Sequence, residues 1–109
     1  MLYLCANDFF KQAENAKRLS REEERKYASE MQAGNESARR ILTDSYLPVL
    51  AAYLKRFSAE PSLELIYRGL ETLDEAISHF NFEAERPPFS KFLGDRLRQT
   101  VTRYIADRK

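Results

Sequence analysis

The sequence predicts an all-α protein, a compact bundle of four to five helices in which residues 1–109 form a single domain. Three observations lead to this prediction. Apolar residues recur at helical spacing along most of the chain. Glycine is scarce, with three residues in 109, and no alternating run of β-branched residues is long enough to form a strand. Hydrophobic residues make up 43% of the chain and charged residues 32%, which is typical of a folded domain with one modest core.

Two helices are predicted in the first third of the chain. The N-terminal segment, residues 1–18, contains "NDFFKQAENAKR", which predicts a short amphipathic helix with its two phenylalanines facing inward. The stretch "LSREEERKYASEMQAG" predicts a second helix that begins with a capping box, because Ser20 is followed three residues later by Glu23. Gly34 is expected to end this helix, since glycine readily adopts the conformation of a C-terminal cap.

A third helix is predicted for residues 36–57, with Asn35 as its N-terminal cap. Its apolar side chains follow a broad helical stripe: Ala38, Ile41, Leu42, Tyr46, Val49, Leu50, Tyr53, Leu54 and Phe57. Pro48 lies inside this stripe. Because proline removes one intrahelical hydrogen bond and clashes with the preceding turn, we expect a kink or a break near Leu47.

The remainder of the chain predicts two more helices and one loop. Ser62 is expected to cap a helix whose apolar face extends to Phe80. The consecutive prolines of "NFEAERPP", residues 81–88, cannot continue a helix, so a loop is expected there. A final helix is expected to start near residues 89–91, with a buried stripe of Leu93, Leu97, Val101 and Ile105.

Side chains suited to catalysis or metal binding are sparse. Cys5 is the only cysteine and His79 the only histidine, which argues against a disulfide within the chain and a zinc site, and favours a cytoplasmic location. No glycine-rich phosphate loop and no nucleophile–base pattern is present, so we expect no enzyme activity and no cofactor. The start "MLYLCANDFF" lacks the basic region of a signal peptide, and no segment is long enough to span a membrane.

Charge is distributed unevenly along a chain whose formal net charge is only +1. Residues 60–85 contain seven acidic residues and one basic residue, a net charge of −6. Residues 86–109 contain seven basic and two acidic residues, a net charge of +5. Such an asymmetry indicates two different partners, although two solvated helix faces would give the same pattern.

The last helix carries side chains suited to nucleic acid. With the leucine stripe facing inward, Arg96, Gln99, Thr102 and Arg103 fall on or near one other side. Arginine can neutralise phosphates, and glutamine offers a donor and an acceptor to a base edge, above all to adenine. Phe89 and Phe92 lie just before these residues and could stack on unstacked bases, but phenylalanines at the start of a helix are also frequent core residues.

The motifs "LSREEERKYASEMQAGNESARRIL", "LELIYRGLETLDEAISHFNFE" and "FSKFLGDRLRQTVTRYIADRK" occur in an order that resembles the housekeeping-type sigma factors of bacterial RNA polymerase. The resemblance covers residues 19–109, which would correspond to the end of the first conserved region and all of the second. It implies a helical bundle that acts as a transcription initiation factor and carries two binding surfaces, one for protein and one for DNA.

The first implied surface is the helix after Ser62, which in this family docks on the clamp helices of the polymerase's largest subunit. The matching residues are Glu64, Tyr67, Arg68, Glu71 and Asp74. The second implied surface is the last helix with its preceding loop, which in this family captures and melts the promoter −10 element and holds its non-template strand. The matching residues are Phe82, Phe92, Arg96, Arg98, Gln99, Thr102 and Arg103.

Within the second surface, Gln99 and Thr102 match residues that read the upstream −10 base pair, and Phe92 matches an aromatic that stacks on a flipped-out adenine. Two departures point away from strand opening. Asp95 and Arg96 stand where the family carries adjacent tryptophans that wedge into the melted junction.

The departures leave an alternative open. The chain could be a sigma-derived interaction module or one subunit of a split sigma factor, without promoter melting. Its partner would then be a second sigma-like chain or an anti-sigma factor.

Overall fold

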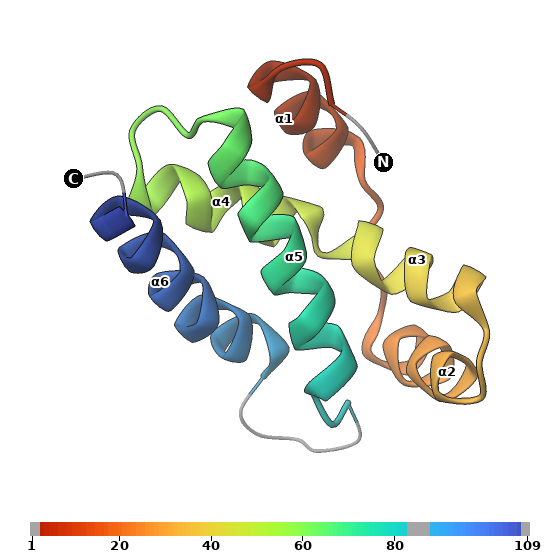
Figure 1. Ribbon diagram of the computed structural model, residues 1–109. Helices are drawn as coiled ribbons and strands as arrows, with labels where there is room; N and C mark the ends of the chain where they lie inside the picture. Colours follow the sequence, from red (N-terminus) through yellow and green to blue (C-terminus); the bar gives the residue numbers. More distant parts are fainter. Residues whose placement is uncertain (1–2, 83–87, 108–109) are drawn as a thin grey trace.

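The computed structural model describes residues 3–82 and 88–107, and all regular structure within these ranges is helical (Figure 1). The helices are α1 (Ala6–Asn15), α2 (Arg21–Gln32), α3 (Glu36–Ser45), α4 (Leu47–Phe57), α5 (Leu63–His79) and α6 (Phe89–Asp107). The all-α prediction is therefore confirmed. Of the loop expected at residues 81–88, residues 83–87 lie outside the described part. Across the described residues, no helix combines the length and the apolar character that crossing a membrane requires.

The described part contains six helices instead of the expected four to five, because the predicted third helix is two separate helices. α3 ends at Ser45, and Tyr46 leaves helical geometry with φ −99° and ψ 2°. Pro48 then occupies the first turn of α4, where the N–H that proline lacks would have no partner inside the helix. The break expected near Leu47 is confirmed, and it separates two helices of similar length.

The helix starts follow local capping rules. Ser20 Oγ accepts a hydrogen bond from the Glu23 backbone N–H at 3.1 Å, and the Glu23 carboxylate accepts one from the Ser20 N–H at 3.0 Å. This is the predicted capping box. Asn35 and Ser62 each accept a hydrogen bond from a backbone N–H in the first turn of α3 and α5, at 3.2 and 3.1 Å. Gly34 connects α2 to α3 with φ +100°, a conformation that favours glycine.

α5 lies at the centre of the molecule, with α6 antiparallel beside it and α4 crossing behind (Figure 1). Gly69 permits close packing of α5 on α4, since a Cβ at this position would lie 3.1 Å from Leu50 Cδ1. Between α5 and α6, the hydroxyls of Thr72 and Thr100 are hydrogen bonded at 2.7 Å. α1 packs on α4 and α5, and the α2–α3 pair lies on the side of α5 opposite α6. The largest fully buried side chains are Phe9, Leu42, Leu47, Leu50, Leu54, Ile66, Leu73, Ile77, Leu93 and Leu97.

The buried stripe of α6 differs from the prediction at its end. Leu93, Leu97 and Val101 are buried as expected, but Ile105 is 48% exposed and Tyr104 is buried in its place. Each step of four residues on a helix overshoots a full turn by about 40°. Three such steps move a side chain by about 120° around the axis, so the stripe must include a step of three residues to stay on the core.

Candidate protein and nucleic-acid interfaces

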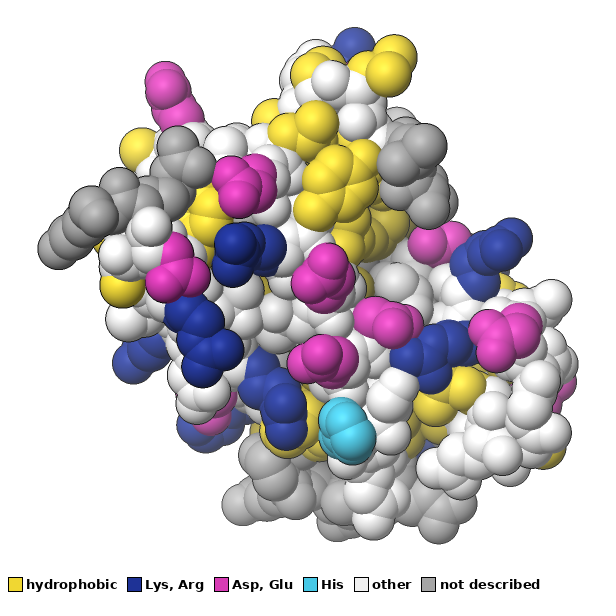
Figure 2. Space-filling model, viewed as in Figure 1, with side chains coloured by type: hydrophobic (Ala, Val, Ile, Leu, Met, Phe, Trp, Pro, Cys, Tyr) yellow, Lys and Arg dark blue, Asp and Glu magenta, His cyan; other side chains and the backbone are white. Residues whose placement is uncertain are grey.

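An acidic band follows α5 on one face of the molecule (Figure 2). Four acidic side chains of this helix are exposed: Glu64, Glu71, Asp74 and Glu75. Basic side chains of neighbouring helices flank this band on both sides. The face therefore combines a negative centre with positive edges, a pattern that attracts a charged protein partner and sets its orientation.

The residues predicted to contact polymerase span about 120° around α5, and the two edges of this span face different neighbours. Glu64 and Arg68 form an ion pair at 3.8 Å, and the Arg68 guanidinium lies over the Tyr104 ring, 5.5 Å from its centroid. The Arg68 edge of the span therefore faces α6. Tyr67, Glu71 and Asp74 instead line a groove on the side of α3. The expected patch is thus continuous, with Glu64 and Glu71 at its centre, Arg68 at the α6 edge and the groove at the α3 edge.

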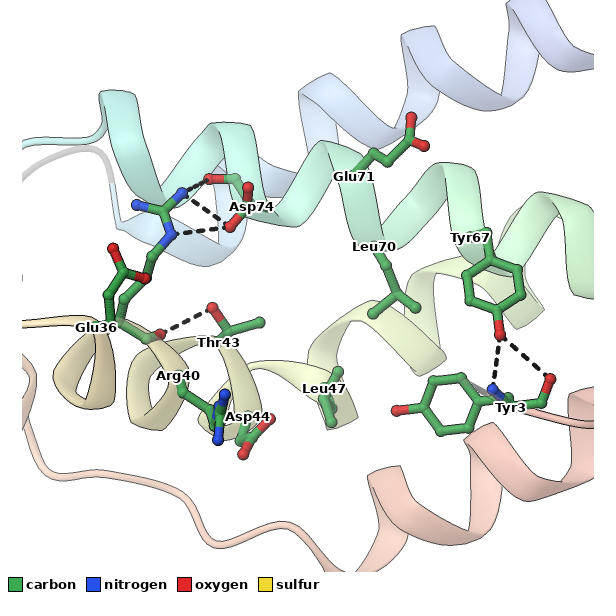
Figure 3. A pocket seen from close by; sticks show the side chains of 11 residues that line it. Tyr3, Glu36, Arg40, Thr43, Asp44, Leu47, Tyr67, Leu70, Glu71 and Asp74 are labelled. Atoms are coloured by element: carbon green, nitrogen blue, oxygen red, sulfur yellow. Dashed lines mark hydrogen bonds and ion pairs between the residues drawn. The ribbon is translucent and has the colours of Figure 1, made fainter. Parts of the chain in front are cut away.

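The groove beside α3 has a volume of about 460 Å³ and is closed at one end by the N-terminal segment (Figure 3). The Tyr67 hydroxyl accepts a hydrogen bond from the Tyr3 N–H at 2.6 Å and donates one to the Tyr3 carbonyl at 3.2 Å. Tyr3 itself is buried. Tyr67 was expected to lie on an exposed patch, but it is half-buried because it holds the start of the chain against α5.

Asp74 also has a partner inside the molecule. Its Oδ1 accepts hydrogen bonds from Arg39 Nε at 3.0 Å and from Arg39 Nη2 at 2.8 Å (Figure 3). Arg39 Nη2 donates a further bond to the Asp74 carbonyl at 3.1 Å. These contacts tie α3 to α5. Of the predicted polymerase contacts that line the groove, Glu71 is the one whose carboxylate is exposed and forms no hydrogen bond or ion pair with a described residue.

Asp44 of α3 lines the same groove. Burial raises the pKa of the Asp44 carboxyl above its usual value, and the positive charge of Arg40 partly opposes this shift. The folded protein therefore holds this proton more tightly than the unfolded chain does, so ionised Asp44 lowers stability once the pH rises above the ordinary aspartate pKa of about 3.9.

Replacing Asp44 with asparagine is expected to raise the thermal midpoint at pH 7 and to have a smaller effect near pH 3, where the aspartate is protonated. Thermal unfolding followed by circular dichroism at the two pH values measures this difference. The exposed residue Glu60 provides the control, since Glu60→Gln should change neither midpoint appreciably. A lower midpoint for Asp44→Asn at pH 7 would show that the ionised carboxylate stabilises the fold.

On α6, four of the predicted DNA contacts form a narrow strip. At about 100° per residue, Phe92, Arg96, Gln99 and Arg103 fall within about 60° of one another. Gln99 and Arg103 are exposed, whereas Phe92 and Arg96 are half-buried. The Arg96 guanidinium lies over the Phe92 ring, 4.7 Å from its centroid. We call these four residues the α6 strip.

The other predicted DNA contacts lie away from the strip. Thr102 is exposed and stands about 60° around the helix from Gln99, whereas Arg98 stands about 100° away. Asp95 is exposed on the same outer face and forms an ion pair with Lys91 at 3.4 Å. Exposed pairs of this kind contribute little to stability, so the Asp95 charge remains available to repel a phosphate.

Phe82 was expected to face melted DNA, but it belongs to the core. It is 7% exposed, stacks on Phe89 with ring centroids 5.3 Å apart, and meets Phe80 edge-on at 5.0 Å. Phe89 is buried as well. For Phe89 the core interpretation is correct, and Phe82 joins it, because both rings fill the space between the end of α5 and the start of α6. Phe92 forms the edge of this aromatic cluster and keeps part of its ring exposed.

A basic surface that the sequence did not reveal lies between α4 and α6. Arg98 lines a small cavity together with Arg56 and Lys91, beside the ring of Tyr53. The Tyr53 hydroxyl donates a hydrogen bond to the Ser90 carbonyl at 3.1 Å. Arg56 is far from α6 in the sequence, so the distribution of charge along the chain could not predict that it lies near Arg98. The only local signal was the basic last turn of α4.

Comparisons with known proteins add no assignment: neither a protein-family model nor a curated protein matches this chain. Within the described residues, no group of histidine, cysteine, aspartate and glutamate side chains is arranged to hold a metal ion. Function is therefore inferred from the α5 and α6 surfaces together with the sequence motifs.

Proposed function

We propose that the chain is a transcription initiation factor domain of the sigma type, which binds RNA polymerase core through α5 and promoter −10 DNA through α6. The observation that carries this proposal is the α6 strip. It presents an aromatic ring, an amide and two guanidinium groups along one accessible side of a helix, next to the acidic band of α5. This combination supports a domain that meets DNA and protein on adjacent surfaces.

The chemistry of the strip suits a single strand that leaves a duplex. Arg96 and Arg103 would neutralise phosphates, and Gln99 can pair with both the donor and the acceptor of an adenine edge. The exposed part of the Phe92 ring offers a π-face to an unstacked base. Because Arg96 covers part of that ring, it would have to move aside, or stack on the base itself, when a strand binds.

The acidic band suits docking on a basic protein surface. Glu71 is exposed at the rim of the groove, and Glu64 is exposed about two turns before it, only about 20° away around the axis of α5. A positive partner helix would be attracted by both carboxylates and could place apolar side chains against Leu70, which is half-buried in the groove. In this proposal the partner is the clamp of the polymerase's largest subunit.

A second candidate is a sigma-derived interaction module or split-sigma subunit that no longer melts DNA. Two observations favour it: Phe82 is committed to the core, and Asp95 places a negative charge beside the strip. Such a module would retain the groove and bind a protein, either polymerase, a second sigma-like chain or an anti-sigma factor. Binding to −10 DNA distinguishes the two candidates.

Removing Arg103 is expected to weaken binding to all single strands and to reduce the slope of log affinity against log salt by roughly 0.7–1 unit, because one phosphate contact is lost. Removing the Gln99 side chain is expected to cost about 1–3 kcal/mol of discrimination for adenine and to leave the salt slope unchanged. Fluorescence anisotropy over a salt series measures both effects. It uses a labelled −10 non-template oligonucleotide and a second version in which the adenine is replaced by another base.

The matched control is Arg25→Gln, which removes an exposed arginine from α2 without touching α6. It should change neither the salt slope nor the base preference. If Arg103→Gln behaves like Arg25→Gln, the α6 strip is not the DNA surface. If the strip binds every oligonucleotide equally and Gln99→Ala has no effect, the non-melting interaction module becomes the better description.

A further inference from the structure

Residues 3–5, which precede α1, lie on part of the surface that the proposed function assigns to polymerase. Tyr3 lines the groove between α3 and α5, and its ring points along the groove towards Leu47 (Figure 3). Two hydrogen bonds, 2.6 and 3.2 Å long, join the Tyr67 hydroxyl to the backbone N–H and carbonyl of Tyr3. Tyr67 is one of the expected polymerase contacts, so the chain itself occupies a hydroxyl that a partner would meet.

Tyr3 also covers apolar surface at this end of the groove. Its side chain is buried in one cluster with Leu47, and half-buried Leu70 packs against that cluster. Leu70 is the residue against which apolar side chains of a docked partner would pack. A partner that fills the groove as far as Tyr67 has to take the place of the Tyr3 ring, because closely packed side chains leave no room for both.

The attachment of residues 3–5 to the fold is small and depends mainly on Tyr3. Leu4 is 92% exposed, and Cys5 is exposed and makes no capping hydrogen bond to α1 through its side chain. α1 is anchored separately by buried residues, among them Phe9, whose ring meets Tyr3 edge-on at 5.4 Å. Release of residues 3–5 therefore breaks the two bonds to Tyr67 and the packing of one ring, a local opening that leaves the helices in place.

We propose that residues 3–5 form an autoinhibitory contact, which closes the Tyr67 end of the groove in the free chain and is displaced when a protein partner docks on α5. This inference rests on the proposed function, in which the partner is the clamp of the polymerase's largest subunit. The open chain is the form that docks, so the apparent dissociation constant equals the intrinsic one divided by the open fraction. Weakening the contact raises the affinity without adding any new contact to the partner.

Tyr67→Phe tests the contact, since it removes the hydroxyl that binds Tyr3 and keeps the ring. The variant is expected to bind polymerase core about threefold or more tightly than wild type, because one net hydrogen bond is worth roughly two- to twelvefold in an equilibrium constant. Biolayer interferometry with immobilised core measures the affinity. Tyr27→Phe, which removes a hydroxyl from half-buried Tyr27 of α2, is the matched control and should bind as wild type does.

A spin label reports the position of residues 3–5 directly. Cys5 is the only cysteine of the chain and is exposed, so a nitroxide can be attached to its thiol. In the free chain, Tyr67→Phe should narrow the electron paramagnetic resonance lines, because the label moves faster once residues 3–5 are released. Binding of the labelled wild type to polymerase core should also narrow the lines, although the complex tumbles more slowly than the free chain.

Three results would overturn the autoinhibitory contact and leave the proposed function intact, since wild type would still bind polymerase. They are equal or weaker binding by Tyr67→Phe, an unchanged spectrum of free Tyr67→Phe, and lines of wild type that broaden on binding. Weaker binding in particular would show that the Tyr67 hydroxyl contacts the partner itself. Absence of binding by wild type and by both variants would instead overturn the proposed function, and this inference with it.

Discussion

Replacing both Glu64 and Glu71 with lysine is expected to abolish binding of the chain to RNA polymerase core and to leave its thermal midpoint within a few degrees of wild type. Both side chains are exposed, and the ion pair between Glu64 and Arg68, which the exchange breaks, is solvated. Such pairs contribute about 0–1 kcal/mol, so the fold should tolerate the change. The docking surface, in contrast, would change from attracting a basic partner to repelling it. Co-purification with tagged polymerase core, together with thermal unfolding, measures the two effects.

The matched control is Glu14→Lys with Glu60→Lys, which changes the net charge equally at exposed sites on α1 and on the connection before α5. This variant should bind polymerase as wild type does. Equal loss in both variants would indicate a general charge effect, and retention of binding by the Glu64 and Glu71 variant would place the polymerase contact elsewhere on the chain.

Truncating Phe9 to alanine is expected to destabilise the protein by about 3–5 kcal/mol, because the ring is fully buried and a cavity would remain in its place. In a domain of this size, such a loss lowers the thermal midpoint by more than about 10 °C. The ring meets Tyr3 edge-on at 5.4 Å, so the variant should also loosen the N-terminal segment that Tyr67 holds. Chemical denaturation gives the free energy of unfolding directly.

Phe10 provides the comparison on the same helix. It is half-buried, with Lys55 over its ring, and Phe10→Ala should cost clearly less than Phe9→Ala. Similar small costs for both variants would mean that α1 is not an integral part of the core and that the single-domain description of the chain needs revision.

The parts of the fold that depend on neighbouring residues could be predicted from the sequence. Ser20, Asn35 and Ser62 cap helices because each accepts a hydrogen bond from a backbone group three residues away. Pro48 divides α3 from α4 through its own missing N–H. The burial of Tyr104 in place of Ile105 was not predicted, because the expected stripe used steps of four residues only. Successive steps of four move the side chains progressively around the helix axis, away from the core.

The candidate site could be predicted only where it lies within one helix. The α6 strip follows from helical periodicity: Arg96, Gln99 and Arg103 share one side of α6 as expected, whereas Thr102, which was expected with them, lies beside the strip. The true surroundings of three other residues depend on distant parts of the chain. Tyr67 binds Tyr3, which is 64 residues away, and Asp74 binds Arg39, which is 35 residues away. Phe82 is covered by Phe89 across a loop. No local pattern encodes such contacts, so the sequence suggested free surface where the fold uses these side chains internally.

The most direct test of the sigma-type function is the affinity of polymerase core for a labelled −10 non-template oligonucleotide, measured with and without the chain. We expect the chain to increase this affinity, and we expect most of the increase to be lost when the adenine of the oligonucleotide is replaced by another base. Phe92→Ala should reduce the increase by about 1–3 kcal/mol, because one stacking face is removed. An affinity that the chain leaves unchanged, or one that it raises equally for both oligonucleotides, would contradict the assignment of α6 as a promoter-reading surface.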